Sequence, residues 1–254
     1  MLSKIYEQWR SRAASEVGEI AEAFFPPLLL RQPNDWAGAL HKVVYVGQET
    51  LGWTWSARET TKHSYITRNY EDIETLQDFI NYDRGVEALI DGYRQFDFSS
   101  HQPINHRSPF WTYFRKIRSA MERNGDSVSI LLINIIRCDV ISEDGFTLWS
   151  LPEADRNRYL QWQKGLLKAE LAALQPTLVL FVSGPYYDDF LRSEFDDLAF
   201  EPLGGFGPRQ LSKLNTAALA APAYRTYHPG YLNRRSRTLG FSPLEAAMAD
   251  AVEF

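Results

Sequence analysis

Three polar side chains follow or interrupt apolar runs of the chain, and their types suit acid–base chemistry. Glu49 comes just after the first run, Asn134 lies inside the second, and His228 follows the last. A carboxylate can take a proton from water, an imidazole can donate or accept a hydrogen bond, and an amide can do both. If the fold brings them together, these groups could polarise and break a polar bond.

Short strands that alternate with helices are the elements that must position these side chains. The predicted strands are rich in apolar and β-branched residues and cover 42–46, 128–136, 178–182 and 223–227. The predicted helices cover 4–25, two segments between 70 and 96 that part near Gly85, and 109–122, 152–174, 186–191 and 242–252. Residues 196–212 contain glycine and proline and are predicted to form a loop.

This alternation predicts an α/β fold, a three-layer α/β/α sandwich with a central four-stranded parallel sheet. Ligands collect at the carboxyl ends of the strands in such sheets, so we expect Glu49, Asn134 and His228 to converge there. The 254 residues suit a single domain, 1–254. Within it, 1–30 is a leading helical segment and 59–96 a helical insertion.

The composition narrows the range of functions. A net charge of -5 argues against a protein that coats nucleic acid through bulk charge, so any such contact must be local. The single cysteine, Cys138, excludes an internal disulfide and a cysteine-held iron–sulfur cluster. The sequence shows no signal peptide and no membrane span, which predicts a cytoplasmic protein. The histidines lack metal-ligand spacing, so we expect no metal and no cofactor.

Four sequences, in this order along the chain, resemble motifs of the uracil-DNA glycosylase superfamily. They are GQETLGW at 47–53, the Phe98-Ser99 pair, LLINIIRCD at 131–139 and YHPGYLNR at 227–234. In the superfamily the first motif reads Gly-Gln-Asp-Pro-Tyr-His or similar, and the last reads His-Pro-Ser before a DNA-inserting loop. Because the chain has a single cysteine, it is similar to the branches of the superfamily that hold no iron–sulfur cluster. The resemblance implies a glycosylase-like fold and a monofunctional DNA glycosylase that leaves an abasic site.

The resemblance also implies roles for individual residues. Glu49 would stabilise positive charge on the sugar and activate water, with Gln48 sharing the task, because glycosidic bonds break through a cation-like sugar. His228 would donate a hydrogen bond to the base as negative charge gathers on it. Asn134 would read the base edge, Phe98 would stack on the base, and Gly47 is counted among the residues that bind it. Two other rings, Phe96 and Phe110, are alternatives to Phe98.

Flipping a base out of a duplex leaves a gap that the protein must hold open. The resemblance makes Leu232 the apolar wedge and assigns DNA contacts to Asn233, Arg234 and Arg235 behind it. Ser183, after the third strand, would bind a phosphate through its hydroxyl or backbone N–H. The implied partner is therefore DNA, double- or single-stranded, and the expected state is a monomer.

Departures from the family motifs suggest an unusual substrate. Glu49 stands where Asp or Asn is commoner, and Leu51, followed by a glycine, stands where a Tyr closes the uracil pocket. We hypothesise a wider pocket that accepts a pyrimidine with a bulky C5 group, such as a modified cytosine of phage DNA. The protein would then act in antiviral defence rather than in repair of uracil.

Two other functions fit the same residues. The first is a catalytically silent DNA-binding module of the same fold, which would use Arg234 and Arg235 but not Glu49. The second is a hydrolase of free nucleosides, which would not need the Leu232 wedge.

Overall fold

Four apolar runs of the sequence form strands, as predicted. Two further strands occur, one inside the predicted loop of residues 196–212 and one that begins at the end of that loop. A computed structural model describes residues 1–50, 73–93, 107–122, 125–141 and 148–252. Its strands are β1 (His41–Gly47), β2 (Val128–Asn134), β3 (Leu178–Phe181), β4 (Ala199–Pro202), β5 (Leu211–Asn215) and β6 (Ala223–Thr226).

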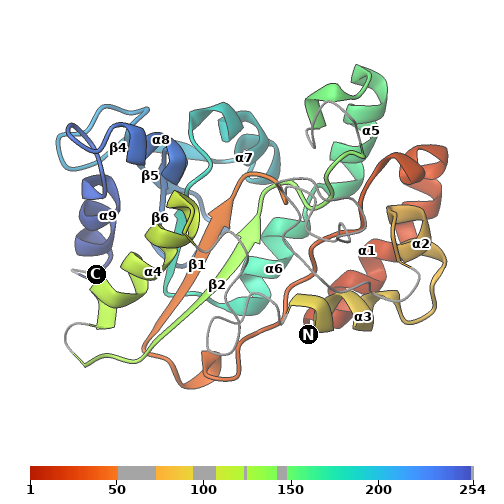
Figure 1. Ribbon diagram of the computed structural model, residues 1–254, viewed down its shortest axis with the longest axis horizontal. Coiled ribbons are helices and arrows are strands. Elements are labelled where there is room, and N and C mark those ends of the chain that lie inside the picture. Colours follow the sequence, from red (N-terminus) through yellow and green to blue (C-terminus); the bar gives the residue numbers. More distant parts are fainter. Residues whose placement is uncertain (51–72, 94–106, 123–124, 142–147, 253–254) are drawn as a thin grey trace. The chain divides into compact units, whose positions relative to one another are not determined.

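These strands form one mixed sheet in the order β2-β1-β3-β6-β5-β4 (Figure 1). The first four are parallel, whereas β5 and β4 are antiparallel to their neighbours. The prediction of a four-stranded, purely parallel sheet is therefore wrong, although its four strands exist. Of the two additional strands, β4 was missed because it lies largely exposed at the edge of the sheet, where no apolar alternation is required.

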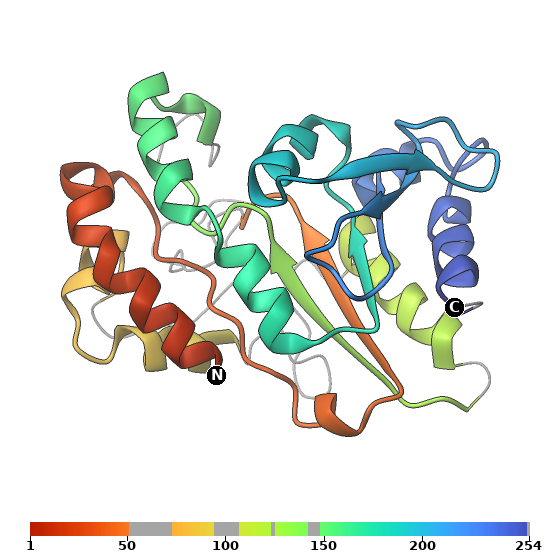
Figure 2. The ribbon, with the colours of Figure 1, turned by 180° about the vertical axis from the view of Figure 1, so that it is seen from behind.

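Helices lie on both sides of the sheet. In Figure 1 the helix α4 lies in front of the strands, and Figure 2 shows the same molecule from behind. The α-helices are α1 (Leu2–Glu16), α2 (Leu76–Asn81), α3 (Gly85–Gly92), α4 (Pro109–Met121), α5 (Glu153–Gln163), α6 (Leu166–Leu174), α7 (Asp188–Glu194), α8 (Pro229–Arg234) and α9 (Ser242–Val252). Short 3-10 helices include η1 (Gly18–Ala23), η2 (Trp36–Gly38), η5 (Leu148–Ser150) and η6 (Pro185–Tyr187).

Three predicted helical boundaries differ from the structure. The helix expected over 152–174 is two helices, because Lys164 takes an extended conformation and Gly165 has a φ of 88°. The leading helix ends at Glu16 rather than near residue 25, because Gly18, at a φ of 59°, turns the chain into η1. The segment after His228, expected to be a loop, is the helix α8.

The chain contacts divide the molecule into two compact units. Unit 1 comprises 1–31, 49–104 and 136–170, and unit 2 comprises 32–48, 105–135 and 171–254. The whole sheet belongs to unit 2, together with α4, α7, α8 and α9. The single domain 1–254 stays a prediction. No helix in the described ranges is long and apolar enough to cross a membrane.

Unit 1 has an aromatic and polar core of its own. The rings of Trp9 and Trp162 stack with centroids 3.9 Å apart, and each indole N–H donates to the other residue's backbone carbonyl. Beside them, Arg137 forms a fully buried ion pair with Glu170, which also accepts a hydrogen bond from Tyr6. A buried charge needs such a partner. The hydrogen bond from Tyr6 in α1 to Glu170 in α6 links these two helices.

Candidate functional site

The ends of β1 and β2 bring a glycine and an amide together. Gly47 and Asn134 are the last residues of the two strands and pair directly in the parallel register. Asn134 is 5% exposed, and a Cβ on Gly47 would lie only 2.3 Å from its Oδ1. Any larger residue at position 47 would therefore displace the Asn134 amide, so the close approach requires glycine.

An aromatic ring lies beside this pair, and it belongs to Phe110. A Cβ on Gly47 would lie 3.3 Å from the Phe110 ring, and the Tyr45 ring centroid is 5.0 Å away. The position of Phe110 follows from helix geometry, since Ser108 caps α4 and the prolyl ring of residue 109 starts its first turn. The hydroxyl of Tyr45 also donates a hydrogen bond to the Phe110 carbonyl at 3.3 Å.

His228 stacks on the same ring. The His228 and Phe110 centroids lie 5.7 Å apart with the planes inclined by 22°. His228 is the N-cap of α8, and its Nδ1 accepts a hydrogen bond from the backbone N–H of Gly230 at 3.1 Å. Because Nδ1 accepts, the proton of the neutral ring sits on Nε2, which is then a hydrogen-bond donor.

The charge state of His228 follows from its surroundings. Burial, and to a smaller extent the positive charge of Arg234, together lower the pKa of the imidazole to about 4. The ring is therefore neutral near pH 7. A neutral donor is the form that the proposed role at the base requires.

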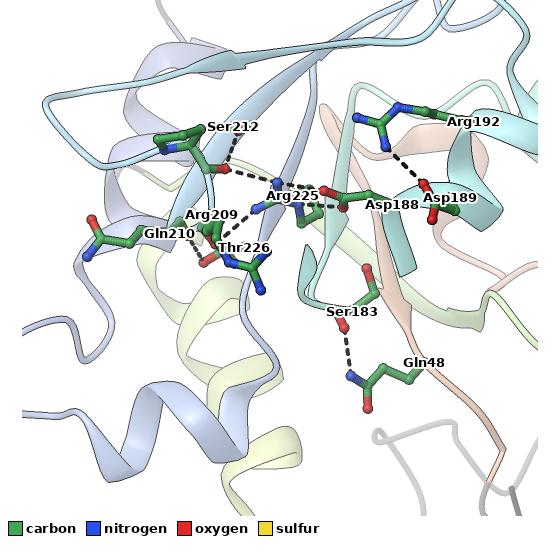
Figure 3. A network of polar contacts seen from close by, with 11 residues as sticks. Gln48, Ser183, Asp188, Asp189, Arg192, Arg209, Gln210, Ser212, Arg225 and Thr226 are labelled. Carbon is green, nitrogen blue, oxygen red and sulfur yellow. Dashed lines mark hydrogen bonds and ion pairs between the residues drawn. The ribbon is translucent and has the colours of Figure 1, made fainter. Parts of the chain in front are cut away.

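Gln48 and Ser183 connect the ends of β1 and β3. The side-chain amide of Gln48 donates to the backbone carbonyl of Ser183 at 2.6 Å (Figure 3). The Ser183 side chain is fully buried, and its hydroxyl has no hydrogen-bond partner among the described residues. The hydroxyl therefore does not lie at the surface, where it could bind a phosphate. The expectation that Ser183 binds DNA through its hydroxyl is wrong for this structure, and binding through its backbone N–H stays a prediction.

The residues after His228 differ in accessibility. Leu232 is 0% exposed, because α8 turns it inward, so the expectation of a projecting apolar wedge is wrong for this structure. Asn233, Arg234 and Arg235 are exposed, as DNA contacts must be. Both arginines lie over the ring of Tyr231, at 6.0 and 5.8 Å from its centroid.

Arg225, which lies near these arginines in sequence, is not part of their surface. It is 2% exposed and forms an ion pair with Asp188 at 2.9 Å (Figure 3). Burial raises the pKa of the Asp188 carboxyl while the Arg225 charge opposes that rise. Arg225 therefore connects β6 to α7 within unit 2.

Three expected site residues need separate mention. Glu49 is half-buried and belongs to unit 1, whereas His228 belongs to unit 2, so the convergence of the two stays a prediction. Phe98 and Leu51 lie outside the described residues. The stacking role of Phe98 and the wider pocket expected at Leu51 therefore stay predictions.

The sequence indicated Phe110 only as an alternative ring, and it did not single out Tyr186 and Arg209, which lie in η6 and just before β5. Phe110 follows Ser108-Pro109, a helix start that could have placed its ring at the strand ends. Tyr186 follows Gly184-Pro185 and is 80% exposed. No sequence pattern pointed to Arg209, because β5, the strand that begins two residues after it, was not predicted.

Comparison with known proteins adds no relative: no protein-family model matches the chain, and no curated protein sequence matches it. Within the described ranges, no group of three or more histidine, cysteine, aspartate or glutamate side chains could hold a metal ion.

Proposed function

We propose that this protein is a monofunctional DNA glycosylase that hydrolyses the N-glycosidic bond of a flipped pyrimidine. The observation that carries the proposal is the grouping of Gly47, Phe110, Asn134 and His228 at the carboxyl edge of the sheet. It combines a flat ring, an amide with donor and acceptor, and a neutral imidazole with its proton on Nε2. Those are the groups that a pyrimidine leaving as an anion needs.

In the proposed reaction, the oxygen of a water bonds to C1′ of the deoxyribose while the bond from C1′ to the base nitrogen breaks. The electron pair of that bond leaves with the base, whose carbonyl oxygen takes on negative charge. The Nε2–H of His228 donates a hydrogen bond to this oxygen, as donors of an oxyanion hole do. Phe110 takes the stacking role expected of Phe98, and Asn134 binds the edge of the base.

Glu49 supplies the carboxylate in this proposal. It takes the proton from water and stabilises the cation-like sugar, a task worth about 10²–10⁴-fold in rate. The chain connection supports this position of Glu49. Glu49 follows Gln48 directly, so the Cα atoms of the two residues lie about 3.8 Å apart. Gln48 itself is held at the end of β1 by its hydrogen bond to Ser183.

The first test is base release from synthetic DNA. Purified protein is incubated with single- and double-stranded oligonucleotides containing uracil, 5-hydroxymethylcytosine or glucosylated 5-hydroxymethylcytosine, and abasic sites are cut with alkali and counted. Release of one of these bases is expected. Release of uracil alone would reject the proposed wide pocket and the role in antiviral defence, and release of none would reject the glycosylase.

The Glu49→Ala variant separates catalysis from binding. It should lower base release at least about 100-fold and leave DNA affinity nearly unchanged, because the carboxylate acts in bond cleavage. A catalytically silent DNA-binding module would instead release no base in either form and would lose affinity in the Arg234→Ala, Arg235→Ala double variant.

A further inference from the structure

An exposed tyrosine with an arginine over its ring lies near the proposed site. Tyr186, in η6, is 80% exposed, and the Arg209 guanidinium lies 5.5 Å from its ring centroid. η6 follows the end of β3. Arg209 comes two residues before β5, and the start of β5 pairs with the end of β6, which His228 follows. The pair therefore lies at the carboxyl edge of the sheet.

The buried guanidinium of Arg225 binds the segments that carry the two members of this pair, and Figure 3 shows its contacts with Asp188 and with the backbone at Arg209. Arg225 donates through Nε and Nη2 to the carboxylate of Asp188, at 2.9 and 3.1 Å, and Asp188 is two residues from Tyr186. It also donates to the carbonyls of Arg209 and Pro208, at 3.0 and 2.9 Å. One side chain thus fixes the backbone on both sides, so the ring and the cation need little ordering when a ligand binds.

The charge of Arg209 is not neutralised by an acidic side chain in the part of the chain that the structure describes. Among the described residues it forms no ion pair. Arg192, nearby on α7, differs because its guanidinium pairs with Asp189 at 3.1 Å. Tyr186 therefore offers a largely exposed ring with a cation over one face, and within the described ranges that cation has no acidic partner. This combination suits a nucleobase and its phosphate.

We propose that Tyr186 and Arg209 form a stacking platform for an unpaired nucleobase beside the flipped-out one, which gives the protein a preference for single-stranded DNA. The faces of bases in a duplex are covered by their neighbours, so an open ring can stack only on a base that has left the helix. The proposal rests on DNA as the ligand of the proposed function. The platform would contact the single strand in addition to the contacts made by Arg234 and Arg235.

The experiment measures binding by fluorescence anisotropy, with a fluorescein-labelled 15-nucleotide single strand and the matching duplex. The full chain should bind the single strand more tightly. Tyr186→Ala should raise the Kd for the single strand about 5- to 100-fold, which is the usual loss on removing one stacking ring. Tyr186→Phe keeps the ring face and should retain most of the affinity.

Two controls match the exposed side chains that are removed. Trp149→Ala removes a ring that is 54% exposed with Arg156 lying 5.1 Å from it, in unit 1. Arg192→Ala removes an arginine from the same unit as Arg209. Neither variant should change the Kd.

Each result decides between the two proposals. An unchanged Kd in Tyr186→Ala, or an equal loss in Trp149→Ala, overturns the platform and leaves the glycosylase standing. A loss confined to Tyr186→Ala without any base release supports the platform and rejects the glycosylase. A full chain that binds no DNA overturns both.

Discussion

At the scale of single residues, the tautomer of His228 is the most consequential feature of the site. The ring accepts a hydrogen bond from Gly230 through Nδ1 and stacks on Phe110, so Nε2 is left as the donor. A histidine before a proline is an ordinary turn residue in sequence. Its neutral form results from burial, which only the folded chain supplies.

This burial predicts a specific pH dependence of stability. The pKa of His228 is about 4 in the folded protein against 6.5 when unperturbed, so the unfolded chain binds more protons between these values. The free energy of unfolding should therefore fall by at most about 3 kcal/mol as the pH drops from about 6.5 to about 4. Urea denaturation across this range measures it.

The control variants for this prediction are His228→Gln and His41→Gln. His228→Gln should lose this part of the pH dependence, whereas His41→Gln, whose ring contacts Asp126, should keep it. An unchanged pH dependence in His228→Gln would show that the ring is not held neutral. Base release should likewise show no titration near pH 6.5, because His228 is already neutral there.

At the scale of elements, the register of β1 and β2 builds the site. It places Gly47 against Asn134, and α4 adds Phe110 from the adjoining layer. The sequence predicted both strands and the helix start, because each has a local pattern. It could not predict that the Asn134 amide lies over Gly47, because that contact joins residues 87 positions apart.

Replacing Gly47 by alanine tests this arrangement. The new Cβ would push Asn134 away, so we expect base release to fall at least about 10-fold and stability by about 1–3 kcal/mol, as for other overpacked sites. Gly38→Ala is the matched control, since a Cβ there meets nothing within 4 Å. Normal base release by Gly47→Ala would contradict the proposed role of Asn134.

At the scale of the whole molecule, the proposed binding of DNA by an acidic chain requires a few local cations. The net charge is -5, and the exposed arginines that we assign to DNA are Arg209, Arg234 and Arg235. Binding should therefore respond only weakly to salt, unlike that of a protein that coats DNA.

Three phosphate contacts predict a slope of about −2 to −3 when the logarithm of the association constant is plotted against that of salt concentration. Anisotropy titrations between about 50 and 300 mM NaCl measure the slope. Each of Arg209→Ala, Arg234→Ala and Arg235→Ala should make it shallower by about 1. A slope steeper than about −6 in the unchanged protein would mean that many more cations touch the DNA than we assign.

The sequence by itself determined the α/β class, the four parallel strands and the identity of the polar residues that follow them, because these depend on local apolar periodicity and turn residues. Only the tertiary structure decided that Leu232 faces inward, that Arg225 is a buried tie to Asp188, that β4 and β5 extend the sheet, and that Tyr186 stands exposed beside Arg209. Burial and pairing arise from contacts between distant parts of the chain, which no local pattern encodes.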